Sequence, residues 1–248
     1  MTRRHRGLRA ALAAAMLVAG GVTVNVATAE PAVADSCYTW NRNLSRGASG
    51  SDVAQLQERI AGWAASGENI AIDGAFGPAT EAALKRFQSA YGLSADGVAG
   101  PNTYSKIYSL QDGDCSPVHF DFSEFDDSCG ENDFTGGRVS AAAAKQNIRR
   151  VMWQLEALRH KLGDRPIVIT SGFRSVSCNS SVGGSSTSLH MSGQAADLGL
   201  GSGPSQCSMY NTAKTSGFEE ILSQGYPGHN DHTHVGNKGS RFWSAPNC

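Results

Sequence analysis

The sequence of 248 residues lacks the features that define several protein classes. Charged residues make up 17% of the chain, the formal net charge is −1, and no cluster of Lys and Arg stands out, so we expect no nucleic-acid partner. Beyond the N-terminus, no apolar run is long enough to cross a bilayer. The composition also lacks the bias of a disordered, collagen-like or coiled-coil chain. These absences leave a globular protein with room for one large domain or two small ones.

Several catalytic signatures are absent as well. No lysine follows a serine at the spacing S-x-x-K, and G-x-S-x-G does not occur, so a serine peptidase is not expected. H-E-x-x-H is missing, which excludes a zinc peptidase with both histidines on one helix. There is no C-x-x-C pair, so we do not expect thiolate ligands for zinc.

The N-terminus has the pattern of a secretion signal. Four arginines lie between residues 3 and 9, an Ala/Val/Leu-rich stretch follows over residues 10–26, and Ala32-Val33-Ala34 forms a small-x-small cleavage site. Residues 27–29 offer a competing cleavage site, and Arg3-Arg4 leaves twin-arginine export open. A membrane anchor is the alternative, but glycines and a threonine interrupt the stretch. We predict a signal peptide over residues 1–34 and a secreted, extracellular, wall-associated protein.

Export changes what the cysteines imply. All six lie after the cleavage site, and an even number in an exported protein favours disulfides. Six cysteines allow 15 pairings, which sequence alone does not resolve. We expect neighbours to pair, as Cys37–Cys115, Cys129–Cys178 and Cys207–Cys248. Each bridge would contribute about 3–4 kcal/mol if it acts by restricting the unfolded chain.

An internal repeat marks the first module. Residues 73–80 and 96–103 both read D-G-x-x-G-P-x-T. Asp-Gly favours a tight turn, and Gly-Pro favours the first turn of a helix, where the missing N–H of proline does no harm. Apolar spacing predicts three helices, over residues 51–65, 78–91 and 101–110.

This segment resembles the peptidoglycan-binding domain family. The matching residues are Gly50, Asp52-Val53, Leu56-Gln57, Asp73-Gly74, Phe76-Gly77, Thr80, Phe87-Gln88, Gly92-Leu93, Asp96-Gly97, Gly100-Pro101 and Thr103. The resemblance implies a small all-α three-helix wall-binding domain, which we place at residues 35–115. A generic helical linker domain is the alternative. The residues that would hold glycan are not identified by the match.

Residues 116–248 are predicted to form a second, α+β domain. An Asp/Glu/Ser/Gly-rich connector over residues 111–139 follows the first module, and we expect a short hinge there. Ser140 is a helix cap for an apolar-periodic segment that ends near residue 162. Strands are expected at 166–170, 194–200 and 233–235, with a helix near 205–217, giving a small antiparallel sheet.

Histidines gather in this second domain. His190 and Asp197 are spaced as H-x6-D, and residues 229–234 read His-Asn-Asp-His-Thr-His. A catalytic zinc needs three protein ligands and one open position, and imidazole and carboxylate both suit it. On a strand, His232 and His234 share one face, so that one can ligate while the other stands beside the metal. A structural or adventitious metal site is the alternative. His119 and His160 are assigned to surface or capping roles.

These motifs resemble the zinc D-Ala-D-Ala carboxypeptidase family, which is related to VanX-type dipeptidases. The resemblance rests on Ser188-Leu189-His190-Met191, Gly193, Ala195, Asp197-Leu198 and Asp231-His232-Thr233-His234. It implies one Zn²⁺ per chain, held by His190, Asp197 and His234. It also implies that Arg174, in Ser171-Gly-Phe-Arg-Ser175, binds the substrate.

The remaining polar residues are assigned to proton transfer. A carboxylate beside the metal suits a general base, and Asp231 lies three residues before His234. We expect His229 to donate a proton or stabilise the oxyanion, and His232 to support the site. The two histidine roles are interchangeable at this stage, and His232 could instead orient a ligand.

The predicted function is hydrolysis of the C-terminal D-Ala-D-Ala bond of peptidoglycan stem peptides, with release of D-alanine. The predicted partners are glycan strands and D-Ala-D-Ala stem peptides, and a monomer suffices. A murein endopeptidase that cuts cross-links with the same zinc site is one alternative. A wall-binding protein with a structural zinc is the other.

Overall fold

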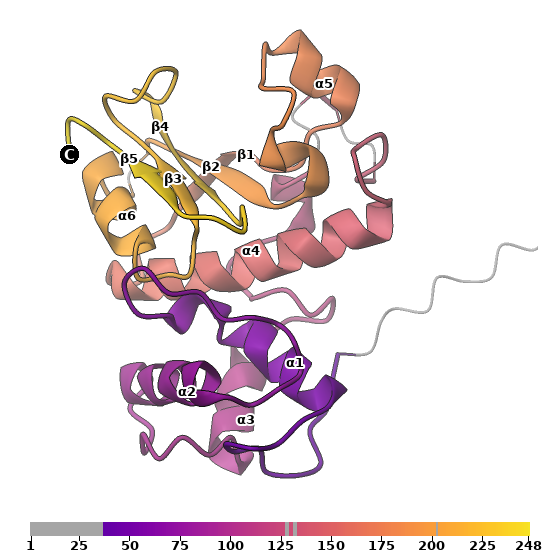
Figure 1. Ribbon diagram of the computed structural model, residues 1–248, viewed down its shortest axis with the longest axis vertical. Helices are drawn as coiled ribbons and strands as arrows, with labels where there is room; N and C mark the ends of the chain where they lie inside the picture. Colours follow the sequence, from indigo (N-terminus) through magenta and orange to yellow (C-terminus); the bar gives the residue numbers. More distant parts are fainter. Residues whose placement is uncertain (1–36, 127–128, 131–132, 202) are drawn as a thin grey trace, which may run out of the picture. The chain divides into compact units, whose positions relative to one another are not determined.

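The computed structural model describes residues 37–126, 129–130, 133–201 and 203–248 (Figure 1). The predicted signal peptide and both candidate cleavage sites lie outside these residues. Among the helices of the described residues, none is long and apolar enough to span a bilayer. The helices are α1 (Ser51–Arg59), α2 (Pro78–Ala90), α3 (Pro101–Ser109), α4 (Ala141–Lys161), α5 (Val176–Ser181) and α6 (Gln206–Ala213). Short 3-10 helices are η1 (Ala61–Trp63), η2 (Phe122–Glu124) and η3 (Leu189–Ser192). The strands are β1 (Val168–Ser171), β2 (Ala195–Gly199), β3 (Glu220–Leu222), β4 (His232–Gly236) and β5 (Phe242–Ser244).

The first repeat unit is a loop organised around one buried glutamine. The amide nitrogen of Gln57 donates to the Asp73 carboxylate at 2.9 Å, to the Ala75 carbonyl at 3.0 Å and to the Thr80 hydroxyl at 3.2 Å. Its amide oxygen accepts the N–H of Gly74 at 2.9 Å. Gly74 has φ +71°, a conformation that glycine adopts without strain. The loop therefore satisfies its own polar groups.

The second repeat unit is built in the same way around Gln88. Its amide nitrogen contacts Asp96, the Val98 carbonyl and Thr103 at 3.0, 3.0 and 3.2 Å, and its oxygen accepts from Gly97 at 3.0 Å. Thr103 and Gln88 are buried. The repeated residues thus hold each helix to the loop that precedes the next helix. Within this fold their role is structural.

Helix α4 contributes to two hydrophobic cores. One face, with Ile148 and Leu155, packs in the core of the second domain. Trp153 and Ala157 pack in the core of the three-helix module. Trp153 is 2% exposed, and its indole N–H donates to the Cys115 carbonyl at 3.1 Å. The connector is buried at this point, so the expectation of a hinge there is wrong.

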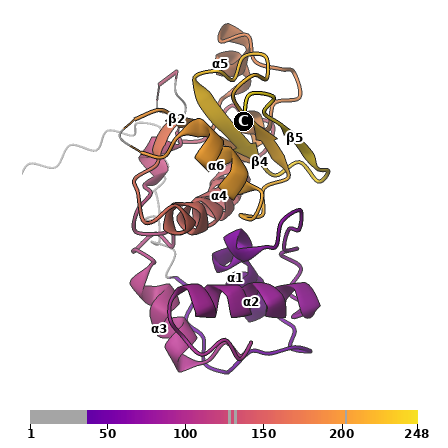
Figure 2. The ribbon, with the colours of Figure 1, turned by 90° about the vertical axis from the view of Figure 1, so that its left-hand side faces the viewer.

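The second domain contains a five-stranded sheet in the order β1-β2-β4-β3-β5. Figures 1 and 2 show α4 running beneath this sheet. The alternate residues Ala196, Leu198, Ile221 and Val235 belong to the core that α4 and α6 share. Because side chains alternate across a strand, their neighbours on β2, β3 and β4 face the other way. That second face carries the candidate site.

The predicted α+β class is confirmed, with one correction in the sheet. The pairs β1–β2, β2–β4 and β3–β4 are antiparallel, but β5 runs parallel to β3. The prediction of an entirely antiparallel sheet is therefore wrong. Strands β3 and β5 have three residues each, which is too short for an alternating pattern to show in the sequence.

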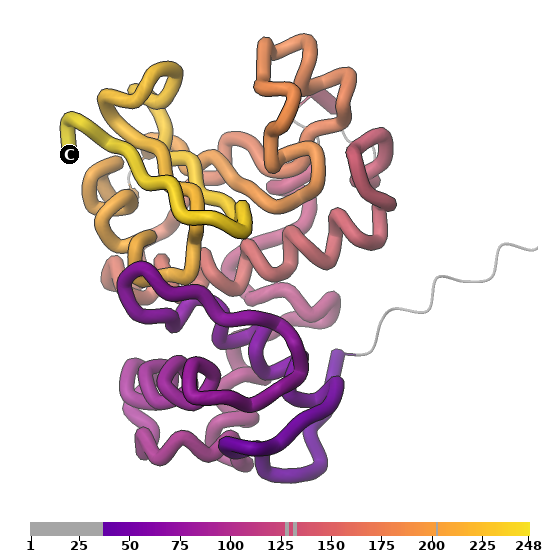
Figure 3. Tube along the Cα trace, in the orientation of Figure 1, coloured from indigo at the N-terminus to yellow at the C-terminus, as the bar shows by residue number. Residues whose placement is uncertain are grey.

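The three expected disulfides are confirmed. Cys37–Cys115 spans the three-helix module, and Cys129–Cys178 joins the second domain's connector to α5. Cys207–Cys248 ties the C-terminus to α6, and the tube in Figure 3 shows this end of the chain beside that helix. Each disulfide joins two cysteines of the same module and closes a loop within it.

Replacing Gln88 should test the structural role of the repeat. Gln88→Ala leaves the N–H of Gly97 and the buried hydroxyl of Thr103 without their partner, so we expect a loss of about 2–3 kcal/mol in the free energy of unfolding. The measurement is urea denaturation followed by circular dichroism. Gln146→Ala, at an exposed position of α4, is the matched control and should change stability by less than about 0.5 kcal/mol. Equal stability of the two variants would contradict this role.

Candidate metal centre

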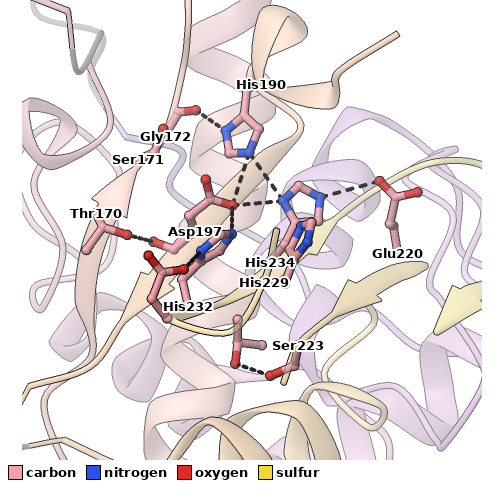
Figure 4. A network of polar contacts seen from close by, with 12 residues as sticks. Thr170, Ser171, Gly172, His190, Asp197, Glu220, Ser223, His229, His232 and His234 are labelled. Carbon is pink, nitrogen blue, oxygen red and sulfur yellow. Dashed lines mark hydrogen bonds and ion pairs between the residues drawn. The ribbon is translucent and has the colours of Figure 1, made fainter. Parts of the chain in front are cut away.

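Three side chains converge on the open face of the sheet. The β2–β4 register places Asp197 directly opposite His234, and η3 brings His190 beside them. The Oδ1 atom of Asp197 lies 2.9 Å from Nδ1 of His234 and 3.2 Å from Nε2 of His190. The two imidazole nitrogens are 3.2 Å apart (Figure 4). All three residues are buried, and their ligand atoms lie close enough together to hold one metal ion.

The atoms of these three residues that face away from the shared centre also have polar contacts. Nδ1 of His190 lies 2.5 Å from the Gly172 carbonyl, which only accepts, so this nitrogen carries the proton and Nε2 keeps its lone pair. Nε2 of His234 faces Oε1 of Glu220 at 3.4 Å. The backbone carbonyl of Asp197 accepts from the Thr170 hydroxyl at 3.1 Å. Both rings are thus oriented with one nitrogen toward the shared centre.

The electrostatics of the three residues suit a cation. Burial raises the pKa of Asp197, but His190 and His234 outweigh it and hold that pKa well below its usual value. Burial alone would lower the pKa of His234, yet hydrogen bonds to Asp197 and Glu220 raise it to about 9. Burial lowers the pKa of His190. The carboxylate attracts positive charge strongly, and two imidazoles and one carboxylate are the ligands that zinc accepts at a catalytic site. The residues therefore fit a zinc ion.

A cavity of about 450 Å³ opens above these residues. Its wall includes the loop over residues 182–189, together with Leu222 and Gly228. Asn179 braces the loop, because its side-chain amide donates to the Ser185 carbonyl at 2.9 Å, and α5, which carries Asn179, is tied down by the Cys129–Cys178 disulfide. The potential metal site is therefore open to a ligand on one side.

Arg174 lies at the edge of the cavity and contacts the cluster. Its Nε donates to the Ser171 hydroxyl at 2.8 Å, and its Nη2 donates to Oδ2 of Asp197 at 2.5 Å. Oδ2 is the oxygen that does not face the histidines. Two of the five guanidinium N–H groups are engaged in these contacts, which fix the side chain.

The structure does not bring Asp231 into the cavity. Its side chain is 88% exposed, and its carboxylate contacts Nδ1 of His232 at 2.8 Å. Asp231 is the predicted general base because a carboxylate beside the metal suits that role and it precedes His234 by three positions. It lies just before β4, and along a strand an odd separation turns side chains to opposite faces. The position does not support a direct contact between Asp231 and the metal.

His232 and His229 do line the cavity. Nε2 of His232 lies 3.7 Å from Oδ1 of Asp197, so this ring stands beside the ligands. The His229 ring lies 4.8 Å from that of His232 and 5.9 Å from that of His234. Nδ1 of His229 donates to the Pro227 carbonyl at 2.9 Å, and burial lowers the pKa of His229. A neutral ring with Nε2 unprotonated follows.

Glu220 was missed in the sequence. It lines the cavity and is 12% exposed, but no motif marks it. Glu220 and Leu222 flank the core residue Ile221, but Leu222 is apolar and the strand has three residues, so no alternation of polar and apolar residues shows in the sequence.

Comparison with known proteins agrees with this geometry. Residues 118–236 match the family described as Peptidase M15, and residues 49–107 match the peptidoglycan binding domain family. The chain is 54% identical over 242 residues to the zinc D-Ala-D-Ala carboxypeptidase of Streptomyces albus G, covering 98% of this chain and 94% of that protein. The chain belongs to the peptidase M15 family.

Two further matches each cover less than a third of this M15 peptidase. The N-acetylmuramoyl-L-alanine amidase CwlL of Bacillus licheniformis is 43% identical over 65 residues, 25% of this chain and 18% of that protein. The crystal structure of the SleB N-terminal domain is 38% identical, with a TM-score of 0.27, and the match covers 29% of this chain and 96% of that one.

Metal analysis should test the centre directly. We expect the purified M15 peptidase to hold one zinc per chain, and His190→Ala to hold almost none, because two remaining ligands do not retain the ion. The measurement is elemental analysis by mass spectrometry after dialysis. His119→Ala is the control, since His119 contacts only Glu156 among side chains of the described residues and should leave zinc unchanged. One zinc per chain in His190→Ala would contradict the assignment.

Proposed function

We propose that this protein is a zinc D-Ala-D-Ala carboxypeptidase that removes the terminal D-alanine from peptidoglycan stem peptides. The observation that carries the proposal is the convergence of His190, Asp197 and His234 at the floor of a cavity that Arg174 also lines. The relative from Streptomyces albus G, which spans almost the whole chain, has this activity in its name. Zinc would be held by the three converging side chains.

Arg174 recognises the substrate in this proposal. A carboxypeptidase must bind a free terminal carboxylate, and a guanidinium binds one through two parallel hydrogen bonds. Ser171 and Oδ2 of Asp197 hold the guanidinium in place from behind. Its remaining N–H groups are left for the carboxylate. The same contacts place the substrate's end next to the ligand Asp197.

Bound zinc would polarise the scissile carbonyl and lower the pKa of water to near ~7. The protein must then carry a proton from that water to the leaving amine. His232 would accept it at Nε2, because Asp231 contacts its Nδ1 and leaves Nε2 toward the cavity. The exposed carboxylate would thus act through His232, as the orienting partner of a base. His229, whose Nδ1 donates to Pro227, has an unprotonated Nε2, so it would take the proton from His232, whose ring lies 4.8 Å away, and pass it to the leaving amine.

The three-helix module would keep the enzyme on its substrate. Peptidoglycan is the partner that this family of modules implies, and glycan strands are the part of it that we propose is bound. Attachment raises the local concentration of stem peptides. We propose that the protein acts outside the cell, associated with the wall and as a monomer, in line with the predicted signal peptide.

A peptide assay should test the activity and the role of Arg174. An acylated peptide ending in D-Ala-D-Ala should release D-alanine, detected by mass spectrometry. Arg174→Ala should retain its zinc but lose about 10²–10³-fold in kcat/KM, because a charge-assisted, two-bond contact is removed. Arg165→Ala serves as the control for loss of one arginine. Hydrolysis of a cross-linked dimer but not of the linear peptide would show an endopeptidase instead.

The pairing of Asp231 with His232 should appear in a double-mutant cycle. We expect about 10–10²-fold loss of kcat in Asp231→Asn, and about 10²–10⁴-fold in His232→Ala, because a general base is removed. The double variant should be no worse than His232→Ala alone. A direct catalytic role for Asp231 would instead make the losses multiply. Asp164→Asn is the matched control, since Asp164 contacts His160 at 3.0 Å in a surface pair.

A further inference from the structure

Glu220 stands behind one of the proposed zinc ligands. Its Oε1 atom lies 3.4 Å from Nε2 of His234, on the side of the ring away from Asp197 (Figure 4). Nε2 is buried and forms no hydrogen bond among the described residues, so the approach of Glu220 is an ion-pair contact to an otherwise unsatisfied atom. Nδ1 of the same ring faces Asp197 at 2.9 Å. The imidazole therefore lies between two carboxylates.

The backbone and one lysine hold Glu220 in this position. On β3, Glu220 and Leu222 share the face that carries the cavity, and Leu222 is paired with His234 on β4. The second carboxylate oxygen of Glu220 forms an ion pair with Nζ of Lys238. One oxygen is thus directed at His234 and the other at a cation. The position of Glu220 is set by these contacts rather than by solvent.

We propose that Glu220 is a positioning residue for His234 in the zinc site. It accepts the N–H at Nε2, which fixes the tautomer whose Nδ1 carries the lone pair and sets the plane of the ring. His190 has the Gly172 carbonyl for the same purpose, whereas His234 depends on Glu220. A carboxylate partner also makes the ligand more basic than a carbonyl does. This inference rests on the proposed zinc site.

Glu220 does not act as a further ligand to the same ion. Its oxygen approaches the nitrogen opposite to the one that faces Asp197, so the width of the imidazole separates it from the shared centre. Its contact with Lys238 leaves no oxygen free of a partner. The fourth position of the centre therefore stays open to the cavity, as a catalytic zinc requires.

The test measures zinc affinity of the full-length protein. Glu220→Ala should weaken zinc binding about 10–100-fold in competition with a chelator, the usual effect of losing an outer partner. Glu220→Gln keeps an oxygen that accepts, so its loss should be smaller. Glu219→Gln, one position along the chain, removes the same charge and should bind zinc as the unchanged protein does. Cobalt substitution should show altered visible absorption in Glu220→Ala alone.

The outcomes separate this inference from the proposed function. Circular dichroism of the metal-free variants checks that they fold. If Glu220→Ala is folded and binds zinc like the unchanged protein, the positioning role is overturned. The positioning role is also overturned if Glu220→Ala keeps its zinc affinity but its KM rises at saturating zinc, because Glu220 would then contact the substrate. If the unchanged protein binds no zinc, the metal centre itself fails, and if it binds zinc without releasing D-alanine, the proposed activity fails.

Discussion

The antiparallel pairing of β2 with β4 is the constraint on which the site depends. It sets Asp197 opposite His234, while the neighbours Ala196 and Val235 on the same strands point into the core. The burial of those neighbours fixes the register, because a slip of one residue would expose the apolar side chains and bury the site. The hydrophobic core thus positions the ligands. Burial of the core residues therefore both stabilises the fold and sets the geometry of the site.

Helix α4 joins the core of the second domain to the core of the N-terminal module. The helix packs under the catalytic sheet on one face and contributes Trp153 and Ala157 to the core of the three-helix module on the other. The repeated loops around Gln57 and Gln88 are satisfied internally, and the module meets α4 through α1 and η1. The three-helix module and the peptidase domain therefore share one packed helix.

Residues that act over short sequence distances were predictable, and those that depend on sheet pairing were not. The repeat and the helix starts follow local chemistry and are identified in the sequence, whereas the expected cysteine pairs are one choice among 15 that the structure confirms. Asp231 illustrates the limit, since its separation from His234 is read from the sequence, whereas the exposure of its side chain is known only from the structure. Glu220 reaches the site only through the pairing of β3 with β4. No local sequence pattern indicates that Glu220 lies at the site.

Charge balance explains why so many ionic groups can lie around one centre. Asp197 and Glu220 are the carboxylates on this face, and each already has its own cation, Arg174 and Lys238 respectively. A divalent ion held by two imidazoles and Asp197 would therefore keep much of its charge uncompensated by the protein. That charge would act on whatever enters the cavity. A peptide that ends in a carboxylate, and a carbonyl oxygen that becomes negative during hydrolysis, are the groups such a site favours.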